Sequence, residues 1–356
     1  MLVTGDLITA TGHGAAPPAD ETIDLTGRTL APGFIDLHAH GGAGFSFDDG
    51  REAIGAALAL HRRHGTTRSV LSLVASPMER LVESLAVIAD LVDADPLVLG
   101  SHLEGPFLSQ DYRGAHQIEH LRPPVPREVE ALIDAGRGTI RQLTIAPELP
   151  GALAAIDTLV AAGITVAIGH TAADFALSSE AFSRGARLLT HAFNAMPGIH
   201  HRAPGPVVAA LGDPRVVLEL ILDGHHVHPE VAAMAFRSAP GRIALVTDAM
   251  AAAGSADGDY RLGDVRVTVL DSLATISGTS TIAGSTLTID AALRRAILET
   301  HLEPVAAIEA VTLTPARALG LDGHLGLLAP GYAADAVVLD AEWAVTSVWA
   351  AGCRLH

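Results

Sequence analysis

The sequence alternates short runs of β-branched and leucine residues with longer segments rich in alanine and leucine. The short runs have the length of single strands, and the longer segments have the length and composition of helices. Such an alternation is typical of a parallel sheet whose strands are joined by helices. It therefore predicts an α/β fold, and the placing of polar residues at the strand ends favours a (β/α)8 barrel of the TIM type.

Most of the predicted strands end in a polar residue or a glycine. They are FIDLHAH from Phe34, RSVLSLV from Arg68, LVLGSHLEG from Leu97, ITVAIGH from Ile164, RLLTHAF from Arg187, VVLELILDG from Val216 and RIALVTDA from Arg242. The segments that begin at Arg51, Met78 and Pro150 are predicted helices. In a barrel of this kind, the carboxyl ends of the strands form the active face, so residues far apart in the sequence would meet there.

The two ends of the chain differ from its middle. Residues 1–31 hold short alternating runs with turn residues between them, and residues 330–356 hold the similar runs GYAADAVVLD and WAVTSVWAAG. Sheets of this size are marginally stable alone. We therefore expect both ends to pair into one small β-sandwich domain beside a barrel formed by residues 32–329.

Composition excludes some classes of partner. The 356 residues carry a formal net charge of −17 and show no basic patch, which argues against a nucleic acid partner. The amino-terminal segment lacks the basic start and apolar core of a signal peptide, and no run is long enough to span a bilayer. We expect a cytoplasmic protein with no membrane partner. The single cysteine, Cys353, excludes a disulfide framework within the chain, and we expect it to be buried.

Metal-binding side chains stand at the ends of several predicted strands. His38 and His40 lie two residues apart, so both imidazoles would point to one side of a strand and could share an ion. Glu104 follows an apolar strand and would be costly to bury without a partner. His170 and His191 close two further apolar runs. Each histidine alone could be an ordinary hydrogen-bonded residue, but together they favour a divalent metal site, with zinc as first choice.

Asp248 ends the run RIALVTDA, where a general base would be needed. A carboxylate beside an activated water can take its proton and later deliver that proton to a leaving amine. The alternative is a helix N-cap, because an alanine-rich stretch follows Asp248 and aspartate is a favoured cap.

Together these segments resemble the amidohydrolase superfamily, and within it the N-acetylglucosamine-6-phosphate deacetylase branch. The resemblance covers nearly the whole chain and is carried by PGFIDLHAHG, HLEGPF, IGHT, HAFNAMPG, DGHHVHP, VTDA, TIAGSTLT and the tail LAPGYAADAVVLD. HLEGPF and HAFNAMPG are its most specific segments. Many other amidohydrolases use a carbamylated lysine as bridging ligand, where this chain offers Glu104. The resemblance implies a hydrolase that converts N-acetylglucosamine 6-phosphate to glucosamine 6-phosphate and acetate.

The resemblance also implies roles for single residues. It assigns the principal metal site to Glu104, His170 and His191, and the presence of His38 and His40 makes one or two ions per subunit the expectation. Asp248 corresponds to the general acid and base of the family. His226 corresponds to the residue that polarises the acetyl carbonyl, although the adjacent His225 leaves open which of the two acts. His228 is expected at the surface or at a helix start.

Recognition of a sugar phosphate requires local positive charge in an acidic chain. By resemblance, Arg202 binds the phosphate and reaches across the interface of a homodimer into the neighbouring site; a solvated surface arginine is the alternative. A planar guanidinium suits this task because it can hold two phosphate oxygens. The other expected contacts are Ala115, His116, Asn194, Ala195, Asp223, Gly224, His225, His226, Ile282, Ala283 and Gly284.

Three other functions remain open on the sequence alone. The chain could be a deacetylase of N-acetylgalactosamine 6-phosphate, since Arg202 and His116 favour a phosphorylated sugar without choosing its stereochemistry. It could be another amidohydrolase, such as a dihydroorotase-like enzyme. A noncatalytic sugar-phosphate sensor is the third alternative, and it is disfavoured because a sensor would need no proton shuttle such as Asp248.

Overall fold

The structure is a computed structural model, and it describes residues 1–14 and 17–356. Eight parallel strands are hydrogen-bonded side by side in the order of the chain, which confirms the predicted barrel. The strands are β4 (Phe34–Ala39), β7 (Thr66–Val74), β8 (Val98–Glu104), β9 (Ile140–Ile145), β10 (Thr165–Ile168), β11 (Leu188–Leu189), β12 (Val217–Leu220) and β13 (Ile243–Leu245). Seven of these eight match the strands expected from the sequence, and β9 was missed.

The barrel closes between its first strand and the segment that follows its last one. Ala249 forms a parallel bridge with Ala39. The amide of Asp248 donates to the carbonyl of His38 at 2.8 Å. Side chains reinforce this seam, because the hydroxyl of Thr247 donates to the buried carboxylate of Asp36 at 2.6 Å. The two ends of the strand series are therefore held together by main-chain and side-chain hydrogen bonds.

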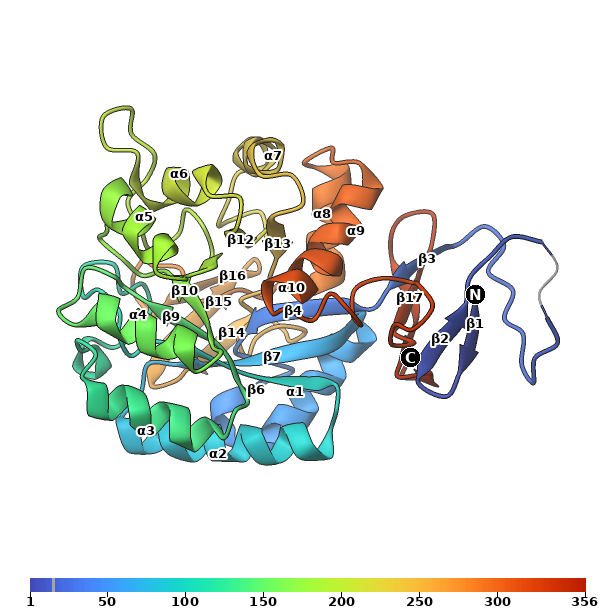
Figure 1. Cartoon of the computed structure of the whole chain (residues 1–356), viewed down its shortest axis with the longest axis horizontal. Helices are drawn as coiled ribbons and strands as arrows, with labels where there is room; N and C mark the ends of the chain where they lie inside the picture. The colour runs from blue at the N-terminus through green and yellow to red at the C-terminus, as the bar shows by residue number, and fades with distance from the viewer. Residues whose placement is uncertain (15–16) are drawn as a thin grey trace.

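Helices surround the barrel in Figure 1 and include the three predicted from the sequence, which are α1, α2 and α4. Their bounds are α1 (Arg51–Arg63), α2 (Met78–Ala94), α3 (Pro126–Gly136), α4 (Ala152–Ala161), α5 (Phe175–Ser183), α6 (Gly205–Gly212), α7 (Pro229–Ser238), α8 (Ile289–Leu298), α9 (Pro304–Val311) and α10 (Leu313–Ala318). The expected helix start at His228 is confirmed, since its side chain accepts from the amide of Glu230. No helix within the described residues is long and apolar enough to cross a membrane.

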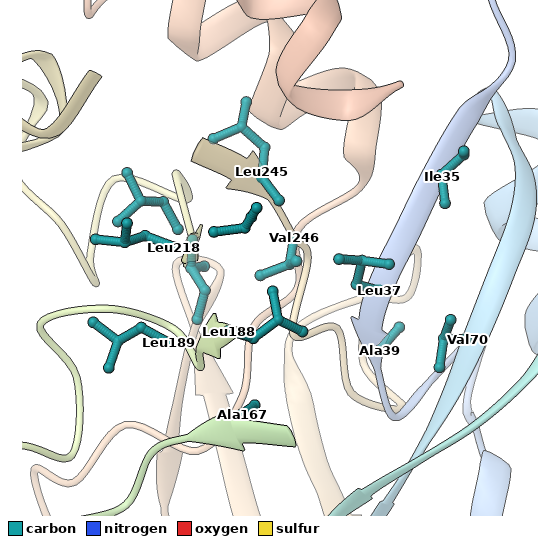
Figure 2. Close-up of a cluster of buried hydrophobic side chains, with 14 of the residues drawn as sticks. Ile35, Leu37, Ala39, Val70, Ala167, Leu188, Leu189, Leu218, Leu245 and Val246 are labelled. Atoms are coloured by element: carbon teal, nitrogen blue, oxygen red, sulfur yellow. The ribbon is translucent and has the colours of Figure 1, made fainter. Parts of the chain in front are cut away.

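The barrel strands bury both apolar and polar side chains. Figure 2 shows apolar side chains from β4, β7 and β10 to β13, among them Leu37 and Leu188, gathered in a buried cluster. Fully or almost fully buried polar side chains stand on the barrel strands or directly after them, namely Asp36, His38, Ser72, His102, Gln142, Thr144, Thr190 and Glu219. Some of them share a strand face with apolar residues, since Ser72 lies two positions after Val70 and Thr190 two positions after Leu188. Polar side chains therefore occupy part of the core that branched apolar residues fill in many such barrels.

Both ends of the chain build the small β region to one side of the barrel (Figure 1). One sheet has the order β19, β18, β17, β3, and β1 pairs with β2 in another. Their bounds are β1 (Leu2–Thr4), β2 (Leu7–Ala10), β3 (Thr29–Pro32), β17 (Ala336–Leu339), β18 (Val345–Ala350) and β19 (Cys353–Arg354). The exact division into residues 1–31 with 330–356 and residues 32–329 stays a prediction. Cys353 is exposed, so the expectation of a buried thiol was wrong.

A three-stranded antiparallel sheet follows the barrel strands and was not predicted. It consists of β14 (Gly258–Leu262), β15 (Val265–Leu270) and β16 (Leu273–Ile276). One of its faces buries Val267 and Val269 against Met250 and Ala283. A smaller antiparallel pair, β5 (Gly41–Gly42) and β6 (Phe45–Ser46), follows the first barrel strand. Both additions lie next to strand ends of the barrel in sequence, which is where the predicted site residues stand.

A buried ion pair joins the barrel to the terminal sheet. Arg68 on β7 donates to both carboxylate oxygens of Asp335, at 2.6 and 3.1 Å. The remaining guanidinium nitrogen donates to the carbonyl of Pro96 at 2.6 Å. The carboxylate also accepts from the amide of Ala351 at 2.8 Å, so the pair is bonded on both sides. With side chains 10% and 7% exposed, Arg68 and Asp335 are shielded from water.

We predict that Asp335→Ala lowers the free energy of unfolding by about 3–5 kcal/mol, because it leaves a buried guanidinium without its counter-charge. Urea unfolding followed by circular dichroism measures this change. Asp90→Ala is the matched control, since it breaks the exposed pair with Arg137 and should leave stability nearly unchanged. Equal effects of the two substitutions would contradict the proposed anchoring.

Candidate metal centre and active site

Glu104 is the meeting point of the predicted metal ligands. Its Oε1 lies 3.1 Å from Nε2 of His170 and 3.0 Å from Nε2 of His191. Its Oε2 lies 3.1 Å from Nε2 of His40, and Oε1 lies 3.4 Å from Nε2 of His38. The donor atoms form two groups that share this carboxylate, one with His38 and His40 and one with His170 and His191. All five residues are buried.

The backbone turns sharply where three of the site residues leave their strands. His170 follows β10 with a φ of 45°, His191 follows β11 with a φ of 26°, and Asp248 follows β13 with a φ of 48°. Left-handed backbone costs a residue other than glycine about 1–2 kcal/mol. Such strain persists only where the surrounding structure enforces it, and it gathers at functional sites. Three strained residues at one rim of the barrel therefore indicate a site selected for chemistry rather than stability.

The spacing of the nitrogen atoms fits a divalent cation. The Nε2 atoms of His170 and His191 are 3.0 Å apart, and those of His38 and His40 are 3.2 Å apart. Two imidazole lone pairs at this distance repel unless a proton or a cation lies between them. Zinc–nitrogen bonds of about 2.0–2.1 Å in a tetrahedron place neighbouring ligands about 3.3 Å apart. Both groups thus have the composition and spacing of a divalent-metal site.

Hydrogen bonds fix the orientation of one imidazole in each group. The Nδ1 of His38 lies 3.2 Å from a carboxylate oxygen of Glu219, and that of His170 lies 2.9 Å from the carbonyl of Tyr112. Neither oxygen can donate, so each Nδ1 carries the proton and each Nε2 keeps its lone pair. This is the arrangement by which protein groups orient metal-binding histidines.

The electrostatics of the cluster also favour a bound cation. Burial alone would raise the pKa of Glu104, but the nearby histidines, His38 foremost, hold it well below its usual range. Burial likewise opposes ionisation of Asp248, yet His38 and His40 lower its pKa. In turn, and against the effect of burial, the two carboxylates raise the pKa of His40 to about 9. The cluster therefore draws positive charge, which a divalent ion supplies in place of protons.

Asp248 lies beside the group formed by His38 and His40. Its Oδ1 is 3.4 Å from Nε2 of His40 and 3.6 Å from Nε2 of His38. The residues after Asp248 form turns and no helix, so the alternative of a helix N-cap is wrong. Its carboxylate is instead placed among imidazoles at the wall of a cavity.

Asp223 orients His226 rather than lining the pocket. One of its carboxylate oxygens accepts from Nδ1 of His226 at 2.7 Å, and the other accepts from the amides of His225 and His226. His226 lines the cavity, whereas His225 is exposed and does not. Of these two neighbours, the geometry therefore favours His226 as the residue that faces a substrate.

A cavity of about 220 Å³ lies over the metal-binding cluster. The predicted residues that line it are His40, Glu104, Ala115, His116, His170, His191, Asn194, Ala195, His226, Asp248, Ile282 and Gly284. Gly114, Leu262 and Thr281 also line it and were not predicted. His116 extends to the cluster, with Nε2 at 3.4 Å from Glu104. His38 lies beneath the cavity wall, and Asp223, Gly224, His225 and Ala283 are likewise absent from the lining.

Arg202 lies outside the cavity of its own subunit. It is exposed, on the loop between β11 and α6, and its guanidinium is 2.6 Å from Nε2 of His201. The residues that line the cavity include neither lysine nor arginine. A phosphate group in this cavity would therefore find no strong cationic partner in the lining residues of the same subunit.

The sequence interpretation missed several polar residues below the cavity. Glu219 contacts His38, and Gln142 donates to Glu219 at 2.8 Å. His102 lies between Ser72 and Thr144, at 2.9 and 2.8 Å, and forms an edge-on contact with His38. The only sequence pattern that could have identified these residues is weak. It is the occurrence of polar residues two positions apart within strands that are otherwise apolar.

Comparison with known proteins agrees with this geometry. Residues 29–352 match the sequence model of the amidohydrolase family. The chain is 41% identical to N-acetylgalactosamine-6-phosphate deacetylase of Escherichia coli O157:H7, over 91% of this chain and 86% of that protein. It is 39% identical to N-acetylglucosamine-6-phosphate deacetylase of Bos taurus, over 94% and 85% of the two chains.

Solved structures extend the likeness to three dimensions. A mutant of N-acetyl-D-glucosamine-6-phosphate deacetylase from Mycobacterium smegmatis, in complex with N-acetyl-D-glucosamine-6-phosphate, has a TM-score of 0.95 and 44% identity. That comparison covers 99% of this chain and 93% of the other. N-acetylglucosamine-6-phosphate deacetylase from Thermotoga maritima gives a TM-score of 0.89 at 30% identity, with the same coverage of 99% and 93%.

The pair of Asp223 and His226 predicts a defined pH dependence of stability. Burial opposes both charges, but the contact with Asp223 raises the pKa of His226, and the contact with His226 lowers that of Asp223 to about 2. Asp223 stabilises the folded protein above its pKa in the unfolded chain, about 3.9, and this stabilisation is lost as the pH falls toward 2. His226 stabilises the folded protein below its pKa in the unfolded chain, about 6.5, and this stabilisation is lost as the pH rises through its raised pKa in the folded protein.

We therefore expect Asp223→Asn to destabilise the protein most between about pH 4 and pH 6.5, with a smaller effect on either side. Urea unfolding of wild type and variant, at pH values within and on either side of this range, measures the difference in free energy of unfolding. A destabilisation that does not vary with pH would contradict the assigned pairing.

Proposed function

The chain belongs to the amidohydrolase family, and we propose that it removes the acetyl group from N-acetylglucosamine 6-phosphate to give glucosamine 6-phosphate and acetate. One observation carries the proposal. Two groups of histidines converge on Glu104 beside Asp248, at the floor of a cavity. The relatives named as deacetylases of this sugar phosphate match the chain over nearly its full length.

We assign the metal ligands by the two groups described above. Glu104, His170 and His191 hold one divalent ion, and His38 and His40 with Glu104 hold a second. Zinc is the first choice, because histidine nitrogen and carboxylate oxygen are, beside cysteine sulfur, the atoms that usually bind it in proteins. When bound, the ions supply Lewis acidity toward water and toward the acetyl carbonyl.

Asp248 moves the proton. Its lowered pKa keeps the carboxylate ionised at neutral pH, so it can accept a proton from the attacking water. The same group then donates that proton to the departing amine, which leaves as a neutral group. An ion held by His38 and His40 would supply the positive charge beside Asp248 that favours its ionised form at the start of each turnover.

His226 stabilises the oxygen of the carbonyl group. Asp223 holds its Nδ1, which leaves Nε2 as the atom available to the cavity. Its pKa is raised, so the imidazole can donate a charged hydrogen bond to the developing oxyanion. A donor fixed in place before the reaction is more effective than water, because it needs no reorganisation as charge develops.

The remaining lining residues shape the sugar pocket. Leu262 and Ile282 offer apolar surface and exclude water on the side of the three-stranded sheet, whereas Asn194 offers a polar side chain. Arg202 lies outside its own cavity, and we propose that it binds the phosphate in the cavity of a second copy within a homodimer. This assignment gives the anionic substrate the cation that one subunit lacks in the cavity lining. We expect the protein to work in the cytoplasm.

N-Acetylgalactosamine 6-phosphate is the second candidate substrate. A curated relative at 41% identity, from Escherichia coli O157:H7, is named a deacetylase of that sugar phosphate. Both candidates present the same acetamido and phosphate groups, and they differ at one hydroxyl of the ring. Acetate release from the two epimers by metal-loaded protein tests the proposal, and release from neither would overturn it.

We predict that Asp248→Asn lowers kcat by at least about 10²- to 10⁴-fold, because an amide cannot carry the proton. Elemental analysis should show the same metal content as wild type. The isosteric substitution preserves the shape of the site, so substrate should still bind. Activity near that of wild type, or loss of the metal, would refute the assigned role.

We predict that Arg202→Ala lowers kcat/KM by about 10- to 100-fold, because a charged hydrogen bond to the phosphate is lost. The shared site gives a sharper test. A mixed dimer of Asp248→Asn and Arg202→Ala subunits has one site with both Asp248 and a partner arginine intact, so mixing two poorly active variants should restore up to half of the wild-type activity.

Differentially tagged subunits, purified as mixed dimers and assayed for acetate release, provide the measurement. Remixing each variant with itself is the control. Absence of any restored activity in verified mixed dimers would place the action of Arg202 within its own subunit or outside catalysis.

A further inference from the structure

Glu219 lies below the metal-binding cluster, in the centre of β12, and is fully buried. Its two carboxylate oxygens are both engaged. One accepts from the side-chain amide of Gln142 at 2.8 Å. The other lies 3.2 Å from Nδ1 of His38 and 3.4 Å from the amide of His191. This one carboxylate therefore contacts a residue from each of the two metal-binding groups.

The chemistry of the group determines what its neighbours must do. An ionised carboxylate only accepts hydrogen bonds, so His38 has to carry its proton on Nδ1. Its Nε2 then presents a lone pair, 3.2 Å from Nε2 of His40 and 3.4 Å from Oε1 of Glu104. With the opposite tautomer, His38 would direct an N–H into this group and could not bind a cation there.

We propose that Glu219 is a positioning residue that sets the tautomer and the direction of His38, and thereby turns His38, His40 and Glu104 into a second metal site. The inference rests on the proposed function only in that the cluster binds divalent ions. It gives Glu219 no contact with the substrate and no part in proton transfer.

A purely structural role would not demand a carboxylate at this position. A neutral amide could accept from Gln142 and from the amide of His191 equally well, as hydroxyls and an imidazole do in the nearby chain of Ser72, His102 and Thr144. A buried carboxylate is costly unless its partners need the charge. Only the contact with His38 requires a group that can accept and never donate.

Glu219→Gln tests this role, because it keeps the size of the side chain and removes the charge. An amide at this position can donate to Nδ1 of His38 and so favour the tautomer that excludes a cation. Metal-depleted wild type and variant are titrated with Co²⁺, and visible absorption together with elemental analysis after gel filtration gives the number of bound ions. These readouts do not depend on turnover.

We expect wild type to bind two ions per subunit. In Glu219→Gln the first ion should bind as in wild type, and the dissociation constant of the second should rise by about 10- to 100-fold. His38→Gln, which removes the ligand itself, sets the scale for complete loss of the second ion. Gln142→Met is the matched control, since it removes the other contact of Glu219, leaves His38 untouched, and should keep both ions.

Three results would overturn the inference, namely unchanged affinity for both ions in Glu219→Gln, equal loss of both ions, or loss of the second ion in Gln142→Met. If Glu219→Gln does not fold, Glu219→Asp replaces it, because its shortened carboxylate should also weaken the second ion. Wild type that binds one ion and releases acetate would overturn this inference alone. Wild type that binds none and releases no acetate would overturn the proposed function as well.

Discussion

The seam that closes the barrel is the constraint on which the site depends. Asp36 on β4 accepts from the hydroxyl and the amide of Thr247, although 211 positions separate the two residues. The same seam aligns the amide of Asp248 with the carbonyl of His38. Because of this pairing, the carboxylate of Asp248 lies beside the imidazoles of His38 and His40 at the end of β4. A barrel open at this point would keep Glu104, His170 and His191 together but would lose the proton carrier.

Hydrogen bonds hold the buried polar residues of the barrel in place. Asp36 is buried, and its burial raises its pKa, so hydrogen bonds from Thr247 and His38 are needed to keep it there. Below the cluster, His102 is buried between hydroxyl groups, and burial together with the charge of His38 lowers its pKa well below the usual value. A neutral imidazole of His102 packs against the ring of His38 without adding charge. Buried polar side chains thus replace part of the apolar packing of the barrel, and they orient the metal ligands above them.

Much of this arrangement could be predicted from the sequence, because the ligands follow strands that are apolar and easily detected. His170 and His191 each end such a run, and the structure brings both to Glu104. The strand β9 was missed for the opposite reason. Its sequence IRQLTI contains Arg141, which donates to the carbonyl of Leu99, and Gln142, which points into the polar interior. Neither contact can be inferred without the neighbouring strands.

Other parts of the site rest on contacts between residues close in sequence that were nevertheless not predicted. Asp223 was expected to line the pocket, yet it binds the imidazole three residues later and orients it. The three-stranded sheet from Gly258 to Ile276 alternates as a strand should, but it follows the last barrel strand, where the alternation of strands and helices favours a helix. Its turn, with Leu262 paired to Val265 across two residues, is a short hairpin connection. In both cases the sequence gives the residues but does not show whether a side chain faces the substrate or its own neighbour, or whether a segment pairs as a sheet.

Charge balance connects the metal centre to the second subunit of the proposed homodimer. The chain has a formal net charge of −17, and the cavity is lined by Glu104 and Asp248 with no lysine or arginine. A sugar phosphate brings further negative charge into the same space, and Coulomb repulsion in a partly desolvated cavity would oppose its entry. Bound divalent ions neutralise the carboxylates at the floor, whereas the phosphate at the opposite end of the substrate needs its own cation. Arg202 is exposed and lies outside its own cavity, so it is free to supply that cation to a second copy of the chain in the dimer that we propose.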